Sequence, residues 1–213
     1  ANAADALSPS AALVKSTMLI SAKAMEEVTA AAPSIEQGWG RILLDDALYF
    51  PYDARRLRAF DESAGFADPA DEPRTHELEV LDGGLPLRAV LTWTDAPSNP
   101  SAEVNLLNDL DLTATSPSGA VYRGNVFVDG ASDTGGSADR VNNVEVLWVE
   151  DPEPGAWTIE VAPHAIPVPD QGYALTVTGR LPAAGVVLER TSLTLDDSIG
   201  GNGDGVLEPG EWV

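Results

Sequence analysis

The sequence of 213 residues contains no cysteine and only two histidines. Without cysteine the chain can form no disulfide, and it offers no thiolate ligand to a metal ion. No hydrophobic run approaches the roughly 20 residues that a membrane-spanning helix needs. The sequence therefore predicts neither a disulfide-stapled scaffold nor a membrane protein.

Basic residues are also scarce. The chain has 12 Lys and Arg against 34 Asp and Glu, a formal net charge of −22, and no lysine follows Lys23. Such a surface repels nucleic acid and anionic membranes and attracts cations, so we expect neither as a partner. For an acidic chain without disulfides, bound calcium is the expected alternative staple.

The small number of histidines bears on catalysis. A Ser-His-Asp triad needs a histidine within reach of both partners. His76 begins an alternating segment with its side chain on the apolar face, and His164 lies in a proline-bounded stretch read as a turn. Neither is near a Gly-x-Ser-x-Gly motif, which is absent, and no aromatic platform accompanies the abundant carboxylates as in glycosidases. We expect no self-contained catalytic site.

Apolar and polar residues alternate with a period of two from Thr75 onward. This pattern, with Gly, Pro and Asp turns between the segments, predicts antiparallel strands and favours a mainly β jelly-roll or β-sandwich barrel over 75–181. Trp93, Trp148 and Trp157 share the parity of the apolar faces and are expected in the core. The alternating segments lie at 76–80, 89–94, 109–114, 143–148, 157–161 and 173–177.

The N-terminal region has a different period. Ser8 fits an N-cap and Pro9 the first position of a helix running toward residue 25. We divide the chain into four parts, with a polar, proline-containing connector before the β domain and a linker with the start of a further β module after it. The predicted boundaries are 1–50, 51–74, 75–181 and 182–213.

Oxygen-bearing side chains gather where the predicted strands meet their loops. Two pairs of these residues project on one side of a strand, Asp109 with Asp111 and Asn143 with Glu145, and calcium takes six to eight oxygen ligands. We therefore predict a Ca²⁺ site at one rim of the β domain. The alternative is that these are solvated strand-edge residues or turn caps. The candidate ligands are Asp95, Asn108, Asp109, Asp111, Asn143 and Glu145.

A second candidate calcium site lies near the end of the sequence. Asn202, Asp204 and Glu211 fit positions 3, 5 and 12 of an EF-hand-type loop. Position 1 is Gly200 instead of Asp, and Pro209 argues against an exiting helix. The alternative is a flexible acidic tail.

Several motifs occur in an order that resembles a known family, the secreted subtilisin-like (S8) serine proteases, in particular alkaline subtilases with a C-terminal β-barrel. The resemblance implies that residues 1–50 are a helical remnant of the α/β catalytic domain and that the barrel binds calcium and supports this domain. The motifs are QGWGR (37–41), LTWTDAP (91–97), NDLDL (108–112), SPSGAVYRGN (116–125), RVNNVE (140–145) and PHAIPVPDQGYALTV (163–177).

The motifs that carry the family's catalytic Asp, His and Ser are absent from this chain. The resemblance thus implies a non-catalytic C-terminal segment of a secreted endopeptidase, inactive alone, with the upstream catalytic domain and protein substrates as partners. Two other functions stay open. One is a carbohydrate- or matrix-binding β-sandwich module, which exposed tryptophans in a row would favour, and the other is a structural spacer in a longer surface protein.

Overall fold

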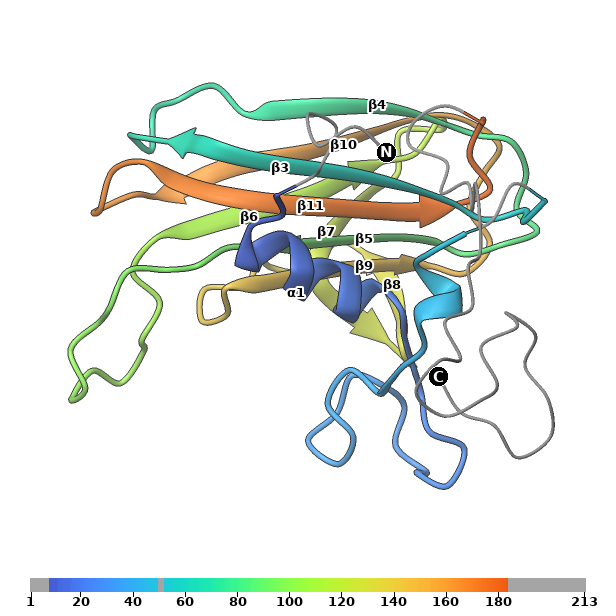
Figure 1. Cartoon of the computed structure of the whole chain (residues 1–213), viewed down its shortest axis with the longest axis horizontal. Coiled ribbons are helices and arrows are strands. Elements are labelled where there is room, and N and C mark those ends of the chain that lie inside the picture. Colours follow the sequence, from blue (N-terminus) through green and yellow to red (C-terminus); the bar gives the residue numbers. More distant parts are fainter. Residues whose placement is uncertain (1–7, 50–51, 184–213) are drawn as a thin grey trace, which may run out of the picture.

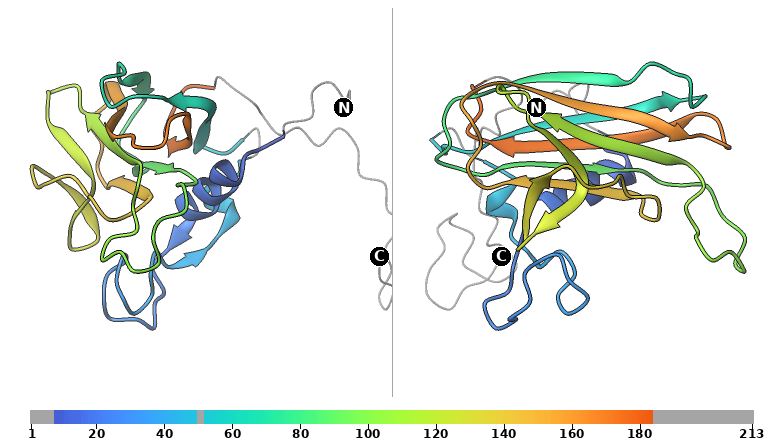
Figure 2. Two further views of the ribbon diagram at one scale, coloured as in Figure 1. Left: turned by 90° about the vertical axis from the view of Figure 1, so that its left-hand side faces the viewer. Right: turned by 180° about the vertical axis from the view of Figure 1, so that it is seen from behind.

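The computed structural model describes residues 8–49 and 52–183 (Figure 1, Figure 2). They form one α-helix, one short 3-10 helix and eleven strands. The helices are α1 (Ala11–Ile20) and η2 (Leu44–Asp46). The strands are β1 (Ala22–Lys23), β2 (Arg41–Ile42), β3 (Arg56–Phe66), β4 (Arg74–Val80), β5 (Leu87–Thr92), β6 (Asp109–Thr115), β7 (Val121–Val128), β8 (Ala131–Thr134), β9 (Val144–Val149), β10 (Gly155–Ala165) and β11 (Gln171–Gly179).

Two antiparallel sheets enclose the main core. One has the strand order β4-β10-β6-β7-β8 and the other β3-β11-β5-β9, and their inner faces share Trp93, Trp157, Tyr173 and Leu110. The prediction of a mainly β, antiparallel fold is therefore confirmed. The predicted barrel is not, because no strand pairing joins the two sheets within the described residues.

Helix α1 lies across the outer face of the four-stranded sheet (Figure 1). Its N-cap is Ser10, whose side chain accepts a hydrogen bond from the Leu13 N–H at 3.0 Å. The predicted cap, Ser8, lies two residues before it, because the helix begins later than its proline suggested. No helix within residues 8–49 and 52–183 is long and apolar enough to cross a membrane.

The helix covers the outer faces of β11 and β5. Ala12 and Leu13 pack against Ala174, and Thr92 Oγ1 donates a hydrogen bond to the Ala12 carbonyl at 2.7 Å. Consequently every residue of β5 is buried, on both faces of the strand. A sheet covered on both sides has no polar face, so period-two alternation no longer identifies its inner side.

The prediction for Trp148 was wrong for this reason. It was predicted in the core, but it lies half-buried on the outer face, with the Arg88 guanidinium 3.7 Å from its ring centroid. Arg88 is 5% exposed and donates hydrogen bonds to the carbonyls of Ile20, the last residue of α1, and Ala22 of β1. Burial lowers the pKa of Arg88 to about 10. This arginine fastens the N-terminal segment to the sheet.

The segment 51–74, predicted as a connector, contains a strand of the four-stranded sheet. β3 pairs along its length with β11, and Phe66 enters the main core. β3 is an edge strand with a largely exposed outer face, so its sequence is polar and does not alternate clearly. The predicted division into a catalytic-domain tail and a separate β domain stays a prediction, and residues 184–213 of the predicted terminal module lie outside the described residues.

Candidate functional site

The six residues of the predicted rim site occupy different surroundings. Asp95 follows β5 and closes the base of the loop that leads to β6. Its carboxylate accepts hydrogen bonds from the N–H groups of Ala96, Leu107 and Asn108, at 2.8, 2.6 and 2.9 Å. Three backbone donors occupy both oxygens, so Asp95 serves as a loop cap.

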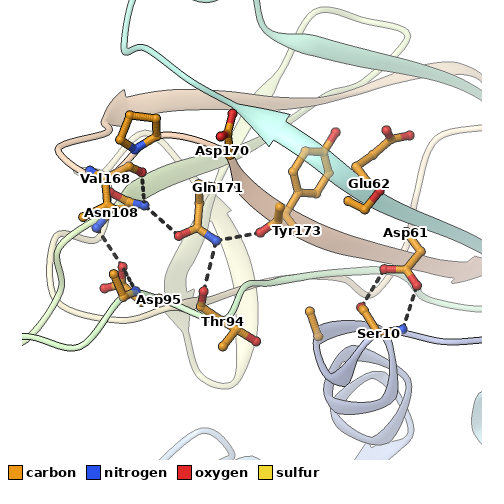
Figure 3. A pocket seen from close by; sticks show the side chains of 15 residues that line it. Ser10, Asp61, Glu62, Thr94, Asp95, Asn108, Val168, Asp170, Gln171 and Tyr173 are labelled. Atoms are coloured by element: carbon orange, nitrogen blue, oxygen red, sulfur yellow. Dashed lines mark hydrogen bonds between the residues drawn. The ribbon is translucent and has the colours of Figure 1, made fainter.

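The two asparagines also have structural partners. Asn108 is 2% exposed, donates to the Val168 carbonyl and Gln171 Oε1, and accepts from the Val168 N–H (Figure 3). Asn143 accepts a hydrogen bond from Lys15 of α1 at 3.2 Å and donates one to the Trp93 carbonyl at 3.0 Å. Both side chains tie neighbouring segments together.

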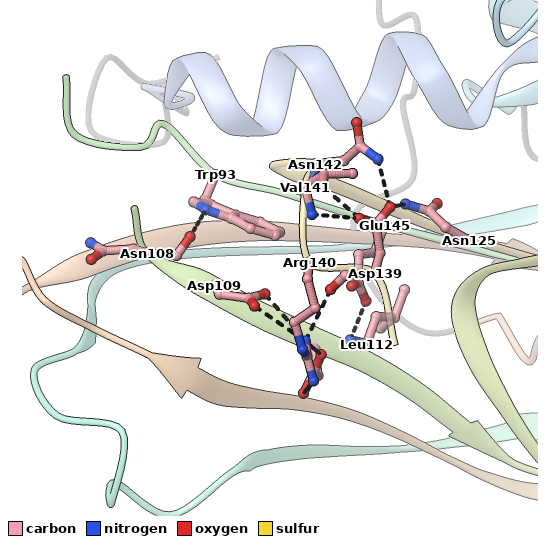
Figure 4. A network of polar contacts seen from close by, with 11 residues as sticks. Trp93, Asn108, Asp109, Leu112, Asn125, Asp139, Arg140, Val141, Asn142 and Glu145 are labelled. Carbon is pink, nitrogen blue, oxygen red and sulfur yellow. Dashed lines mark hydrogen bonds and ion pairs between the residues drawn. The ribbon is translucent and has the colours of Figure 1, made fainter. Parts of the chain in front are cut away.

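Asp109 and Asp111 of β6 do project together, as predicted, and both contact Arg140. Figure 4 shows Arg140 beside Asp109. Arg140 Nη1 lies 2.5 Å from one oxygen of Asp111, and Nη2 lies 3.1 Å from the other. The shortest distance from Arg140 to the Asp109 carboxylate is 3.3 Å. Burial raises the pKa of Asp109 although Arg140 acts in the opposite direction, and hydrogen bonding to Asp111 raises the pKa of Arg140.

Glu145 points into the molecule, which is a second correction. It was predicted to project away from the apolar face of β9, but Leu147 and Val149, which share its parity, lie in the main core. Glu145 is 2% exposed, and its Oε2 accepts a hydrogen bond from the Leu112 N–H at 2.5 Å. Burial raises its pKa to about 8, and the nearby acidic side chains add to this rise.

Two neighbours of this cluster were missed as functional candidates, Asn125 and Asp139. Asn125 has φ +60°, donates to the Val144 carbonyl and to Asp139, and accepts from the Val146 N–H. It thereby links β7 to β9 where the two sheets meet without strand pairing. Hydrogen bonds from Asn142, Val141 and Asn125 lower the pKa of Asp139 despite its partial burial. Asn125 and Asp139 are brought together only by the fold. In the sequence, Asn125 ends the motif YRGN and Asp139 directly precedes the motif RVNNVE.

The described residues do not fit a calcium ion bound by the predicted set. The oxygens of Asp95 and Asn108 are engaged elsewhere, whereas Asp109 and Asp111 already face a guanidinium. Within residues 8–49 and 52–183, no three His, Cys, Asp or Glu side chains are placed to hold a metal ion. The terminal loop with Asn202, Asp204 and Glu211 lies outside the described residues. Calcium binding by this chain stays a prediction.

A cavity of about 300 Å³ with several acidic residues in its lining opens at the same end of the sheets (Figure 3). Four acidic side chains line it, Asp61, Glu62, Asp95 and Asp170, together with Tyr173. Asp61 accepts hydrogen bonds from the Ser10 N–H and hydroxyl, and Asp95 caps its loop. The cavity therefore favours a cationic group over an anionic one.

The two histidines have surroundings that do not form a catalytic pair. His76 stacks on Phe60 with 4.0 Å between ring centroids, and its Nε2 is buried without a hydrogen-bond partner. His164 lies exposed in β10, and not in a turn as predicted, because β10 extends past Pro163 with a bulge. Neither imidazole hydrogen-bonds to a serine of the described residues.

A second hollow, which we call the apolar groove, lies beside α1, between this helix, η2 and β3. Its volume is about 360 Å³ and nearly all of its lining is apolar. Val14, Met18, Leu44 and Leu48 are between 39% and 50% exposed. The lining residues are Pro9, Leu13, Val14, Thr17, Met18, Leu44, Leu48, Leu57 and Ala59.

Comparison with solved structures finds distant likenesses. No protein-family model matches the sequence, and no curated protein does. A solved structure from Sulfurospirillum deleyianum is similar with a TM-score of 0.31 and 6% identity, over 61% of this chain and 99% of the other. The Aeromonas sobria serine protease, solved in complex with a chaperone, is similar with a TM-score of 0.30 and 15% identity. That match covers 67% of this chain and 30% of the protease chain. Likenesses this weak establish no family.

Proposed function

We propose that the chain is the C-terminal segment of a secreted subtilisin-like serine endopeptidase, and that its β domain supports a catalytic domain upstream. The ordered motifs from QGWGR to PHAIPVPDQGYALTV suggest the family. The structural observation that carries the proposal is the apolar groove on α1. The catalytic Asp, His and Ser belong to the upstream domain, so the segment itself contributes support and no chemistry.

The groove matters because α1 is apolar on two sides. Ala12, Leu13 and Ile20 are buried, whereas Val14 and Met18 on the other side stay 47% and 41% exposed. Exposed apolar side chains that gather beside a groove of this kind mark a contact surface. The residues that line the groove lie mainly in the part of the chain that resembles the end of a catalytic domain, so this domain is the occupant we propose.

We infer further that the two sheets form a jelly roll. Without β8, the sheet orders are β3-β11-β5-β9 and β4-β10-β6-β7. Consecutive strands switch sheets at every step except from β6 to β7, the pattern of two nested Greek keys in an eight-stranded jelly roll. This order supports the inference independently of the sequence motifs.

The alternative of a carbohydrate- or matrix-binding module gains no support from the tryptophans. Among the described residues, Trp93 and Trp157 are each 1% exposed, Trp148 lies beneath Arg88, and Trp39 packs edge-on against Phe127. A sugar platform would need such rings in an exposed row.

Active-site labelling tests the proposed division of labour. A fluorophosphonate probe should label the longer protein that carries the upstream region and leave this 213-residue chain unlabelled. Labelling of the isolated chain would contradict the proposal, because a reactive serine would then lie within it. The proposal would also fail if the gene encoded no catalytic Asp, His and Ser motifs upstream of this chain.

Substitution in the groove tests the docking surface. Met18→Glu should leave the melting temperature of the isolated chain nearly unchanged, because residue 18 is 41% exposed there. In the longer protein it should lower the yield of active protease at least tenfold, because a carboxylate would be buried without a partner. The matched control is Val128→Glu on the β7–β8 hairpin, where Val128 is 55% exposed and does not line the groove. Equal effects of the two substitutions would contradict the proposed surface.

A further inference from the structure

One guanidinium lies among several carboxylates at the rim of the sheets. Asp109 and Asp111 come from β6, Asp139 from the loop before β9, and Glu145 from β9 itself (Figure 4). Arg140 contacts the first two directly, and Glu145 lies near enough to raise its pKa as well. It is the one Lys or Arg between positions 123 and 180 of the sequence.

The contacts of Arg140 have the geometry of a strong ion pair. Both terminal nitrogens face Asp111, one per carboxylate oxygen, which is the two-pronged arrangement that arginine forms with carboxylates. Nη1 also donates to the Asp139 carbonyl at 2.9 Å. The side chains of Asp109 and Asp111 are only 8% and 21% exposed, so water screens their mutual repulsion weakly.

The loop that presents Arg140 is itself fixed. The Asp139 carboxylate accepts hydrogen bonds from the N–H groups of Val141 and Asn142, at 2.8 and 3.1 Å, and from the side chain of Asn125. This holds the backbone next to Arg140 in one conformation. The loop backbone therefore loses little further conformational freedom when Arg140 meets the carboxylates.

We propose that the Arg140 guanidinium is the internal cation of this carboxylate cluster and takes the place there of a divalent metal ion. Strand β6 then keeps its two aspartates side by side without calcium. A single guanidinium contacts both aspartates, Asp111 through two nitrogens and Asp109 through one. This inference is independent of the proposed protease function and of a calcium ion at the terminal loop.

Melting of the 213-residue chain in EDTA and in excess calcium chloride tests the inference. The terminal-loop variant Asp204→Asn/Glu211→Gln serves as the background, so that the second predicted calcium site does not contribute. We expect the same melting temperature in both solutions. A rise with calcium that disappears when Asp111→Asn is added would overturn the proposal, because a metal ion would then be using this cluster.

Substitution of the arginine gives the second test. Arg140→Gln leaves one buried and one partly buried carboxylate without a cation, and the melting temperature should fall by roughly 5 °C or more. Adding Asp109→Asn and Asp111→Asn to it removes the repulsion and should restore most of the loss. An Arg140→Gln variant as stable as the original chain would refute the inference, as would a triple variant no better than Arg140→Gln. If Arg140→Gln does not fold, the triple variant is tested for folding instead. A folded triple variant supports the inference, and an unfolded one refutes it.

Discussion

Glu145 should make the stability of this protein fall as the pH rises. Its carboxyl is 2% exposed, and burial raises its pKa from the ordinary value of 4.5 to about 8. Between these two values the unfolded chain has released the proton while the folded chain still holds it. The stability that this carboxyl contributes is therefore fully present below about pH 4.5 and is lost as the pH rises through about 8.

The magnitude follows from the width of this interval. A single proton bound only in the folded state changes the free energy of unfolding by about 1.4 kcal/mol per pH unit. Over the whole interval the loss has an upper limit of roughly 5 kcal/mol, and water entering beside the carboxylate reduces it, so we expect about 2–5 kcal/mol. This is a large part of the total stability of a typical domain.

Glu145→Gln isolates the effect, because glutamine has nearly the same shape and can still accept the Leu112 N–H. Urea denaturation from pH 5 to pH 9 in EDTA should give similar stabilities for both proteins at pH 5. At pH 9 the glutamine variant should be more stable by the amount above. Glu103→Gln, at an exposed loop position, is the matched control and should show no such divergence. A Glu145→Gln difference that is the same at pH 5 and pH 9 would refute the reasoning.

Two further predictions concern close contacts. Gly65 and Gly38 have nearly equal φ values of +56° and +58°, but a Cβ at Gly65 would lie 1.7 Å from the Gln171 carbonyl oxygen, whereas Gly38 has open space. Gly38→Ala should cost about 1 kcal/mol and Gly65→Ala several more, measured by urea denaturation, and equal losses would contradict this packing. Burial lowers the pKa of His76 against the attraction of Glu62, so the stability it contributes is present above its ordinary pKa of 6.5 and is lost as the pH falls through the lowered folded value. His76→Phe should remove this acid sensitivity in thermal melts between pH 4 and 7, and an unchanged pH profile would show that the imidazole stays hydrated.

The buried face of a strand could be predicted where only one of its two faces carries apolar residues. Leu110 and Leu112 alternate with Asp109 and Asp111, and β6 indeed has its leucines in the core and its aspartates on the rim. The pattern failed at β9, where Val144 and Val146 pack under the N-terminal segment while Leu147 faces the other sheet. Both faces of β9 carry apolar residues, so alternation alone could not say on which side Glu145 lies.

The candidate calcium site shows the same limit. The sequence predicts that Asp109 and Asp111 share a side of their strand, since adjacent odd positions of a strand always do. It does not predict that Arg140, 29 residues away, reaches both, because this depends on how the β8–β9 loop folds over the rim. Asp95 and Asn108 were grouped with them by their place near strand ends, and each satisfies a separate part of the backbone instead.

By itself the sequence determined the composition-dependent properties of this protein, namely its acidity, its lack of disulfides and its antiparallel β character, because these follow from residue types and their local period. Only the tertiary structure decided which cation faces the rim carboxylates, which side of β9 is the interior and which polar segment becomes the edge strand β3. Each of these depends on contacts between residues far apart in the chain, and such contacts leave no local pattern for a sequence to display.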